Sequence, residues 1–180
     1  MKLSTKLFFI LCIGLSFVSY SQQSFPESWI GNYKGGLSIY GVDSVRMKIK
    51  MNLDIVKTAN DSIYDWTITY DFKGKKDVRA YSLIIVDRQK GQYKIDEKNS
   101  IVIDAYLYND KIFTSFFKVM ESYVIATYTK EENDIVFEII SGKSEPVSTT
   151  GNTKQGEEDI PEVVAYLVNG RQKAVLKKAD

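Results

Sequence analysis

The sequence predicts an all-β fold: a single antiparallel meander β-barrel of about ten strands that follow one another along the chain. Three observations predict it. Apolar and polar residues alternate with a period of two, short polar turns separate the alternating stretches, and no segment between Trp29 and Ile140 keeps a helical period for ten residues. The chain shows no internal repeat and no second domain, so residues 22–180 are expected to form one barrel domain.

The first 21 residues predict a secretory signal peptide. Lys2 and Lys6 give a positive start, Leu7 to Val18 are apolar, and Ser19-Tyr20-Ser21 supplies small residues at a cleavage site. A retained membrane anchor is the alternative, but the apolar run is shorter than the roughly 20 residues of a membrane span. We therefore expect a secreted or periplasmic protein with no transmembrane span in its mature chain.

Composition excludes several kinds of chemistry. Cys12 is the only cysteine, and because apolar residues continue after it, it does not end the leader as a lipidated cysteine does. The sequence contains no histidine, so Ser-His-Asp and Cys-His catalysis and zinc sites built on His or Cys are excluded. The formal charge of +1 becomes −1 once Lys2 and Lys6 are removed, which gives no reason to expect nucleic acid as a partner. We expect no enzyme, metal or cofactor.

The first expected strand lies within Trp29 to Tyr40. The next, Asp43 to Ile55, has the clearest alternation: Val45, Met47, Ile49, Met51, Leu53 and Ile55 on one face, and charged or polar residues on the other. Thr58 to Asp61 form a turn, and Tyr64 to Phe72 alternate in the same way.

The following segments are also predicted strands of apolar, β-branched and aromatic residues, separated by polar turns. They are Val78 to Val86, Tyr93 to Asp96, Ile101 to Tyr108, Ile112 to Met120, Tyr123 to Thr129 and Ile135 to Ile140. Ser141 to Asp159 is rich in Gly, Ser and Thr and is predicted to be a long polar loop. After it, Val163 to Val168 and Arg171 to Lys177 are predicted to form a hairpin around Asn169-Gly170, a favoured turn sequence.

Closure into a barrel is favoured over a sandwich of two sheets. An open sheet of this size exposes two edges, and closure removes them. The connections are short and local, as in a meander. Closure requires Tyr33 to Leu37 to pair with Lys173 to Lys177.

The opening segment W-I-G-N-Y-K-G-G, residues 29–36, resembles the first strand of calycin-type barrels, which include lipocalins, fatty-acid-binding proteins and nitrobindins. The resemblance implies that Trp29 plugs one end of the barrel and that Gly31 and Gly35 let the strand bend as the sheet closes. It also implies that a basic residue of the last strand, Arg171, packs over Trp29. An exposed Arg171 beside the Asn169-Gly170 turn is the alternative.

The sequence departs from each of these families. Gly31 follows Trp29, whereas lipocalins place the glycine first. Gly41 to Ser44 has no room for the helical pair of fatty-acid-binding proteins, and the histidine that holds haem in nitrobindins is missing. The resemblance therefore implies a lipocalin-like fold without histidine-ligated haem.

Six residues are candidates for ligand binding. Arg79 and Tyr81 lie two apart on one strand face, similar to the Arg-x-Tyr pair that anchors carboxylates in fatty-acid-binding proteins, although there it is on the last strand. The alternative places Arg79 on the outer face. Four aromatic residues are expected to line a cavity unless they are plain core: Tyr106, Tyr108, Phe117 and Tyr128.

One acidic residue, Asp104, faces the same side of its strand as Tyr106 and is a candidate for a partly buried acid. The alternative is a solvated aspartate, since no second carboxylate accompanies it. The function we expect is binding of a small apolar or amphipathic molecule. The alternative is a cell-envelope interaction or assembly protein with a packed barrel, and a carboxylate-based hydrolase comes third.

Overall fold

The computed structural model describes residues 24–179; the predicted signal peptide, residues 1–21, lies outside them. Within residues 24–179 the regular elements are strands, apart from one short 3-10 helix, η1 (Glu27–Trp29). The strands are β1 (Gly31–Tyr40), β2 (Val45–Lys57), β3 (Ile63–Phe72), β4 (Lys75–Asp87), β5 (Gln92–Asp96), β6 (Val102–Tyr108), β7 (Ile112–Val119), β8 (Ser122–Glu131), β9 (Asp134–Thr150), β10 (Thr153–Gln155), β11 (Glu158–Ile160) and β12 (Val163–Lys178).

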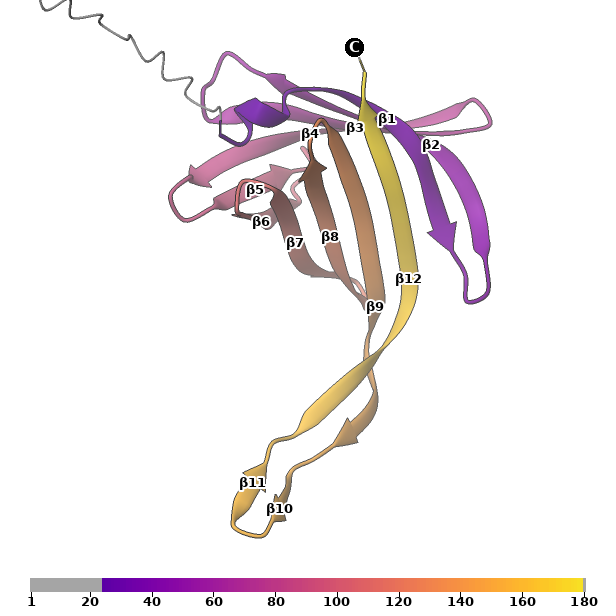
Figure 1. Ribbon diagram of the computed structural model, residues 1–180, viewed down its shortest axis with the longest axis vertical. Coiled ribbons are helices and arrows are strands. Elements are labelled where there is room, and N and C mark those ends of the chain that lie inside the picture. The colour runs from indigo at the N-terminus through magenta and orange to yellow at the C-terminus, as the bar shows by residue number, and fades with distance from the viewer. Residues whose placement is uncertain (1–23, 180) are drawn as a thin grey trace, which may run out of the picture.

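Ten of these strands form a closed barrel in which sequence neighbours pair in order from β1 to β9, and β12 closes the ring between β9 and β1 (Figure 1). Every pair is antiparallel, as the meander prediction requires. Tyr33 lies opposite Lys178 and Leu37 lies opposite Ala174, so the predicted closure of the first strand on the last is confirmed.

Glycines on β1 permit this closure. Gly35 lies opposite Leu176 of β12, and a Cβ atom added to Gly35 would overlap the carbonyl oxygen of Val175. Gly31 has a φ of 151°, a conformation that side-chain-bearing residues rarely adopt. The predicted structural role of both glycines agrees with these positions.

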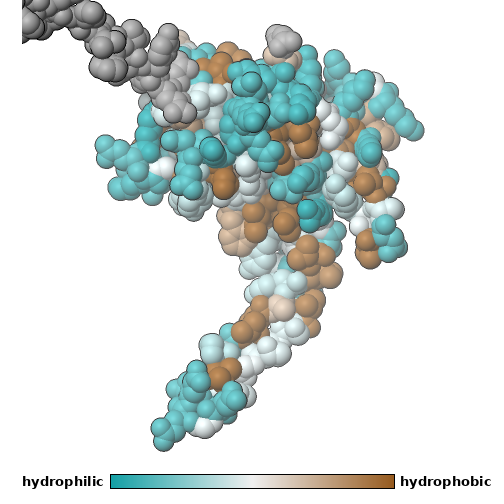
Figure 2. Space-filling view, viewed as in Figure 1, coloured by the Kyte–Doolittle hydropathy of each residue, from teal (hydrophilic) through white to brown (hydrophobic). Residues whose placement is uncertain are grey.

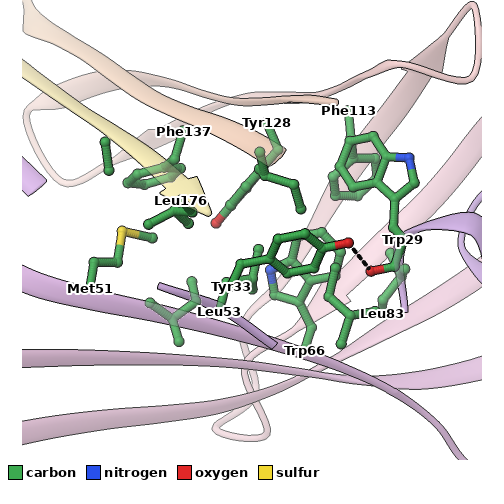
Figure 3. Packing of buried hydrophobic residues seen from close by; sticks show 14 of the residues in the cluster. Trp29, Tyr33, Met51, Leu53, Trp66, Leu83, Phe113, Tyr128, Phe137 and Leu176 are labelled. Carbon is green, nitrogen blue, oxygen red and sulfur yellow. Dashed lines mark hydrogen bonds between the residues drawn. The ribbon is translucent and has the colours of Figure 1, made fainter. Parts of the chain in front are cut away.

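The core lies inside the barrel, where Trp29 of η1 packs among residues of the strands (Figure 3). Inward-facing residues of nearly every strand meet there, with large aromatic rings in contact across the interior. The largest side chains that are almost fully buried are Trp29, Trp66, Tyr33, Tyr64, Phe25, Phe113, Phe137, Leu37, Met51, Leu53, Ile55 and Leu83.

The prediction of a polar loop at Ser141 to Asp159 is wrong. β9 continues to Thr150 and pairs with β12, which starts at Val163, and these segments form a long two-stranded arm, residues 141–170, with β10 and β11 at its tip (Figure 1). Strand pairing uses backbone groups, so Ser and Thr side chains that remain in water do not prevent it. Polarity of the sequence therefore did not distinguish a loop from an exposed ribbon.

The prediction of a hairpin turn at Asn169-Gly170 is also wrong, because β12 runs through it without reversing. Val168 pairs with Gly142 and Arg171 with Ile140, and the pairing register shifts between Val168 and Gly170. Long-range pairing with β9 on both sides converts a favoured turn sequence into a bulge at the base of the arm.

Candidate ligand-binding cavity

The barrel end that carries η1 is plugged. Trp29 is fully buried, and its ring meets that of Phe25 edge to face with the centroids 4.9 Å apart. The Tyr33 hydroxyl donates a 2.8 Å hydrogen bond to the Trp29 carbonyl (Figure 3). The expectation that a tryptophan at the start of the chain closes one end therefore agrees with the structure.

An ion pair holds this plug in place. Arg88, just after β4, donates to both carboxylate oxygens of Glu27 at 2.9 and 2.6 Å and to the Phe25 carbonyl at 2.8 Å. The Tyr64 hydroxyl also donates to Glu27, at 2.6 Å. The hydrogen bonds from Arg88 lower the pKa of Glu27 to about 2. The segment before β1 is thereby fixed across the end of the barrel that carries η1.

The opposite half of the barrel contains a cavity of about 120 Å³. Its floor is the aromatic layer above the plug, and its wall comes from β3 to β9. The lining residues are Trp66, Ile68, Tyr70, Arg79, Tyr81, Ile95, Glu97, Ile103, Phe113, Ser115, Phe117, Ala126, Tyr128, Phe137 and Ile139.

A second hollow of about 290 Å³ lies at the mouth, towards the arm end of the barrel. It shares Tyr70, Arg79 and Ile139 with the inner cavity and adds residues of β1, β2 and β12. The two spaces therefore meet at these three side chains, and a molecule extending from one to the other passes Arg79.

Arg79 is the one cation among the cavity-lining residues, and it lies at the rim. Its guanidinium donates to Asp77 at 3.2 Å and lies 5.4 Å from the centre of the Tyr70 ring. Both Arg79 and Asp77 have about half or more of their side chains exposed, so this pair contributes little to stability and is open to exchange.

Three tyrosines present neutral hydroxyls to the cavity. Burial raises the pKa of Tyr70 to about 12, and burial also raises the pKa of Tyr81 and of Tyr128. All three hydroxyls therefore stay protonated at physiological pH and act as hydrogen-bond donors or acceptors without charge. Apart from Arg79 and Glu97 at the rim, the rest of the lining is aliphatic or aromatic, with the single small hydroxyl of Ser115.

Four of the six predicted ligand-binding residues line the cavity: Arg79, Tyr81, Phe117 and Tyr128. The alternative of Arg79 on the outer face is thereby excluded. Whether these four residues bind a ligand stays a prediction.

The placement of Tyr106 and Tyr108 is wrong, because both point outward from β6 and are exposed. Their neighbours Ala105 and Leu107 face inward instead. Asp104 lies on the same outward face, 3.8 Å from Lys94, and is the solvated aspartate of the alternative reading. A charge on that face was the available signal that its tyrosines are outside.

The prediction that Arg171 packs over Trp29 is also wrong. Arg171 pairs with Ile140 at the arm end of the barrel, where its guanidinium lies 3.5 Å from Glu138 and 5.8 Å from the centre of the Tyr40 ring. The plug is at the other end, beside Lys178, seven residues or about 23 Å further along β12. Arg88 supplies the basic residue beside the plug.

Sequence reasoning missed several lining residues, among them Tyr70, Ser115 and Ala126. Tyr70 shares the inward face of β3 with Trp66 and Ile68, so alternation identified its face but not its depth. Ser115 and Ala126 face each other on β7 and β8, and their small size leaves the space that the cavity occupies.

Within residues 24–179, no helix is long and apolar enough to cross a membrane. Nor does this part place three or more acidic side chains where they would hold a metal ion.

Comparison with protein-family models and with curated proteins gives no match. Among solved structures, the chain is similar to the S-type phycobiliprotein lyase CPES from Guillardia theta, with a TM-score of 0.57 and 10% sequence identity, covering 88% of this chain and 94% of that chain. At this identity the similarity shows the fold alone. It agrees with the closed antiparallel barrel that the sequence predicted.

Proposed function

We propose that this chain is an exported, calycin-type barrel that binds a small amphipathic molecule, with its apolar part in the inner cavity and its polar head at Arg79. The observation that carries the proposal is an apolar cavity that opens beside a single exchangeable arginine. Pockets of this composition, apolar with a few polar groups at one side, are the usual form of small-molecule sites.

The cavity size restricts the apolar part. An engineered cavity of about 150 Å³ in another protein takes up benzene, so 120 Å³ accommodates one ring or a short aliphatic chain. The mouth, shared at Tyr70, Arg79 and Ile139, offers room for the remainder. We therefore expect a ligand with one ring or a medium-length chain.

The rim restricts the head group. A ligand carboxylate competes with Asp77 for Arg79. Breaking the exposed Arg79–Asp77 ion pair costs at most about 1 kcal/mol of free energy. A hydrogen bond between the bound carboxylate and the guanidinium contributes about 1.5–3 kcal/mol. Glu97 lies beside Tyr81 at the same rim and disfavours a ligand with more than one negative charge.

Titration calorimetry with octanoate and 1-octanol tests this proposal. We expect wild-type protein to bind both, and octanoate more tightly. Ala126→Leu, which fills the cavity from β8, should weaken the binding of both by more than tenfold, whereas Tyr106→Ala on the outer face is the matched control and should bind as wild type does. Wild-type protein that binds neither compound, and that carries no small molecule in native mass spectrometry when purified from its own source, would contradict the proposal.

Export belongs to the same proposal and rests on Lys2, Lys6, Leu7 to Val18 and the small residues up to Ser21. Mass spectrometry of the mature N-terminus tests it, with Gln22 as the expected first residue. The similar solved protein is a lyase by name, and the expectation that this chain is not an enzyme stays a prediction.

A second candidate function is that of an envelope interaction protein. The observation that favours it is the arm, which exposes apolar residues well away from the barrel (Figure 2). It requires no ligand, so the Ala126→Leu variant would keep it.

A further inference from the structure

The arm has two free edges. β8 accompanies β9 only as far as Lys143, and β1 accompanies β12 only from Gln172 onward. Between these points, within the part of the chain that the structure describes, each strand of the arm pairs only with the other. Alternate backbone N–H and C=O groups along both edges therefore lack a strand partner. An isolated two-stranded ribbon is marginally stable in water, and a third strand stabilises it.

The two edges differ in how well they can accept another strand. On β9, Pro146 removes a donor, and the two register shifts between Ala165 and Val168 place extra residues, Val147 among them, on this strand; the third shift lies outside residues 163–168, at Asn169 of β12. On β12, the segment V-V-A-Y-L-V, residues 163–168, has no charge, no proline and no glycine. Segments of this kind pair readily with a further strand. Native proteins usually protect such an edge with charge or proline, and β12 here has neither.

Several apolar side chains of β12 also lie in water. Val163 and Val168 are 57% and 65% exposed, and Tyr166 and Leu167 are exposed as well. Figure 2 shows this hydrophobic zone in the middle of the arm, between the barrel and a hydrophilic tip. The zone coincides with the unprotected edge.

We propose that residues 163–168 of β12 pair antiparallel with the same residues of a second copy of this chain. In full overlap Val163 faces Val168, Val164 faces Leu167 and Ala165 faces Tyr166 of the partner. The pairing is symmetric, buries the exposed apolar residues and joins two ribbons into one four-stranded sheet. Because the segment is uncharged, no like charges meet when it pairs with itself.

The charge distribution supports a second copy of this chain as the partner. The arm has Lys143 and Lys154 against five carboxylates, which gives −3, and the rest of residues 24–179 has twenty Lys and Arg against seventeen Asp and Glu, which gives +3. The arm therefore suits the barrel of another copy and is repelled by an anionic membrane surface. Four of the carboxylates lie at or near its tip: Glu157, Glu158, Asp159 and Glu162.

The same register brings the tip to a basic groove. Continuing the pairing past Val168 places Glu162 beside Asn169 of the partner, and Asp159 and Glu158 beyond it towards the end of the β1–β2 hairpin. A groove of about 460 Å³ lies there, lined by Tyr40, Gly41, Val42, Arg46, Val168, Asn169, Gly170 and Arg171. Two arginines thus face the acidic tip, once in each half of the symmetric pair.

Sedimentation velocity of residues 22–180 tests the proposal. Strand pairing over six residues, with one small groove contact in each half of the dimer, lies at the low end of interface size, so we expect a micromolar dimer. Val163→Lys with Val168→Lys puts lysines opposite lysines at both ends of the pairing and should weaken the dimer at least tenfold. Val147→Lys, equally exposed on β9, is the matched control and should leave the dimer unchanged.

Two charge reversals test the groove. Arg171→Glu, and separately Glu157→Lys with Glu158→Lys, should each weaken the dimer, because both contacts in each homodimer become repulsive. An equal mixture of the two variants should restore it, since both contacts in the heterodimer then join opposite charges. No restoration in the mixture would exclude the groove contact and the register that requires it.

Cross-linking tests the register independently, because residues 22–180 contain no cysteine. An equal mixture of Ala165→Cys and Tyr166→Cys proteins should form disulfide-linked dimers faster than either alone. A wild-type protein that stays monomeric at high micromolar concentration would overturn the proposal. So would a monomer that instead floats with lipid vesicles, which would assign the apolar zone to a membrane surface.

Discussion

The two ends of the barrel are built from the same alternating strands, but side chains fill the interior at the plug end and leave a cavity towards the mouth. On β2, Met51, Leu53 and Ile55 are fully buried near the plug, whereas Met47, on the same face, is 42% exposed near the mouth. The interior residues near the plug are large aromatic rings, and those nearer the mouth include Ser115 and Ala126. An apolar face thus becomes core only where residues on the facing strands fill the space.

The ion pairs at the two ends differ in the same way. Glu27 and Arg88 are held by two bonds to each other and by further bonds to Tyr64 and the Phe25 carbonyl. Arg79 and Asp77 form an exposed pair, and beyond this pair Arg79 lies against the Tyr70 ring. The less exposed pair, with its additional hydrogen bonds, stabilises a fixed plug, and the more exposed pair leaves a cation available to bind a ligand.

The largest effect is expected at the plug. Trp29→Ala removes a fully buried ring and should lower the free energy of unfolding by about 3–5 kcal/mol. Trp29→Phe should lower it much less, because the indole Nε1 has no hydrogen-bond partner among the described residues and nothing is left unpaired. Chemical denaturation measures both. Equal losses for Ala and Phe would contradict a plug that acts by filling space.

At the mouth, the largest effect is expected from Ala126→Leu. The added side chain enters the inner cavity, so affinity for octanoate should fall by more than tenfold, while unfolding free energy changes by no more than about 1–3 kcal/mol. Calorimetry and denaturation of the same sample separate the two effects. A variant that binds normally would place the ligand outside this cavity.

Arg79→Met should have a smaller and more selective effect. It keeps the apolar length of the side chain and removes the charge, so affinity for octanoate should fall about tenfold, as expected for a charged hydrogen bond worth at least 1.4 kcal/mol. Affinity for 1-octanol should stay the same. Equal losses for the acid and the alcohol would show that Arg79 acts by shape and not by charge.

Much of the fold was predictable because apolar and polar residues alternate along the strands with a period of two, which separates the two faces of each strand. The ten barrel strands, the closure of β1 on β12 and the position of the plug follow from residues such as Trp29, Gly35 and the alternation of β2. The arm was not predictable, because the Ser and Thr residues before Thr150 are equally compatible with a loop and with an exposed ribbon. Asn169-Gly170 failed as a turn since local preference was overridden by pairing with β9.

The site was predictable only in part, because alternation separates two faces without saying which is inside. On β4 the face of Arg79 and Tyr81 is the inner one, and on β6 the face of Tyr106 and Tyr108 is the outer one. Aromatic residues occur on both faces of this chain, so their presence alone did not decide. Depth along the strand, which separates core from cavity, depends on the facing strands and is not contained in any one segment.

The smallest effect concerns acid. The pKa of Glu27 is lowered from 4.5 to about 2 by the hydrogen bonds from Arg88, so the pair stabilises the folded state fully above pH 4.5 and loses this contribution as the pH falls towards 2. Because both side chains are about one-third exposed, we expect a loss of about 1 kcal/mol. Glu27→Gln should be less stable at pH 7 and should lack this part of the acid dependence. Denaturation curves between pH 2 and 7 for both proteins measure the difference, and parallel pH profiles would show that Glu27 does not hold the plug through its charge.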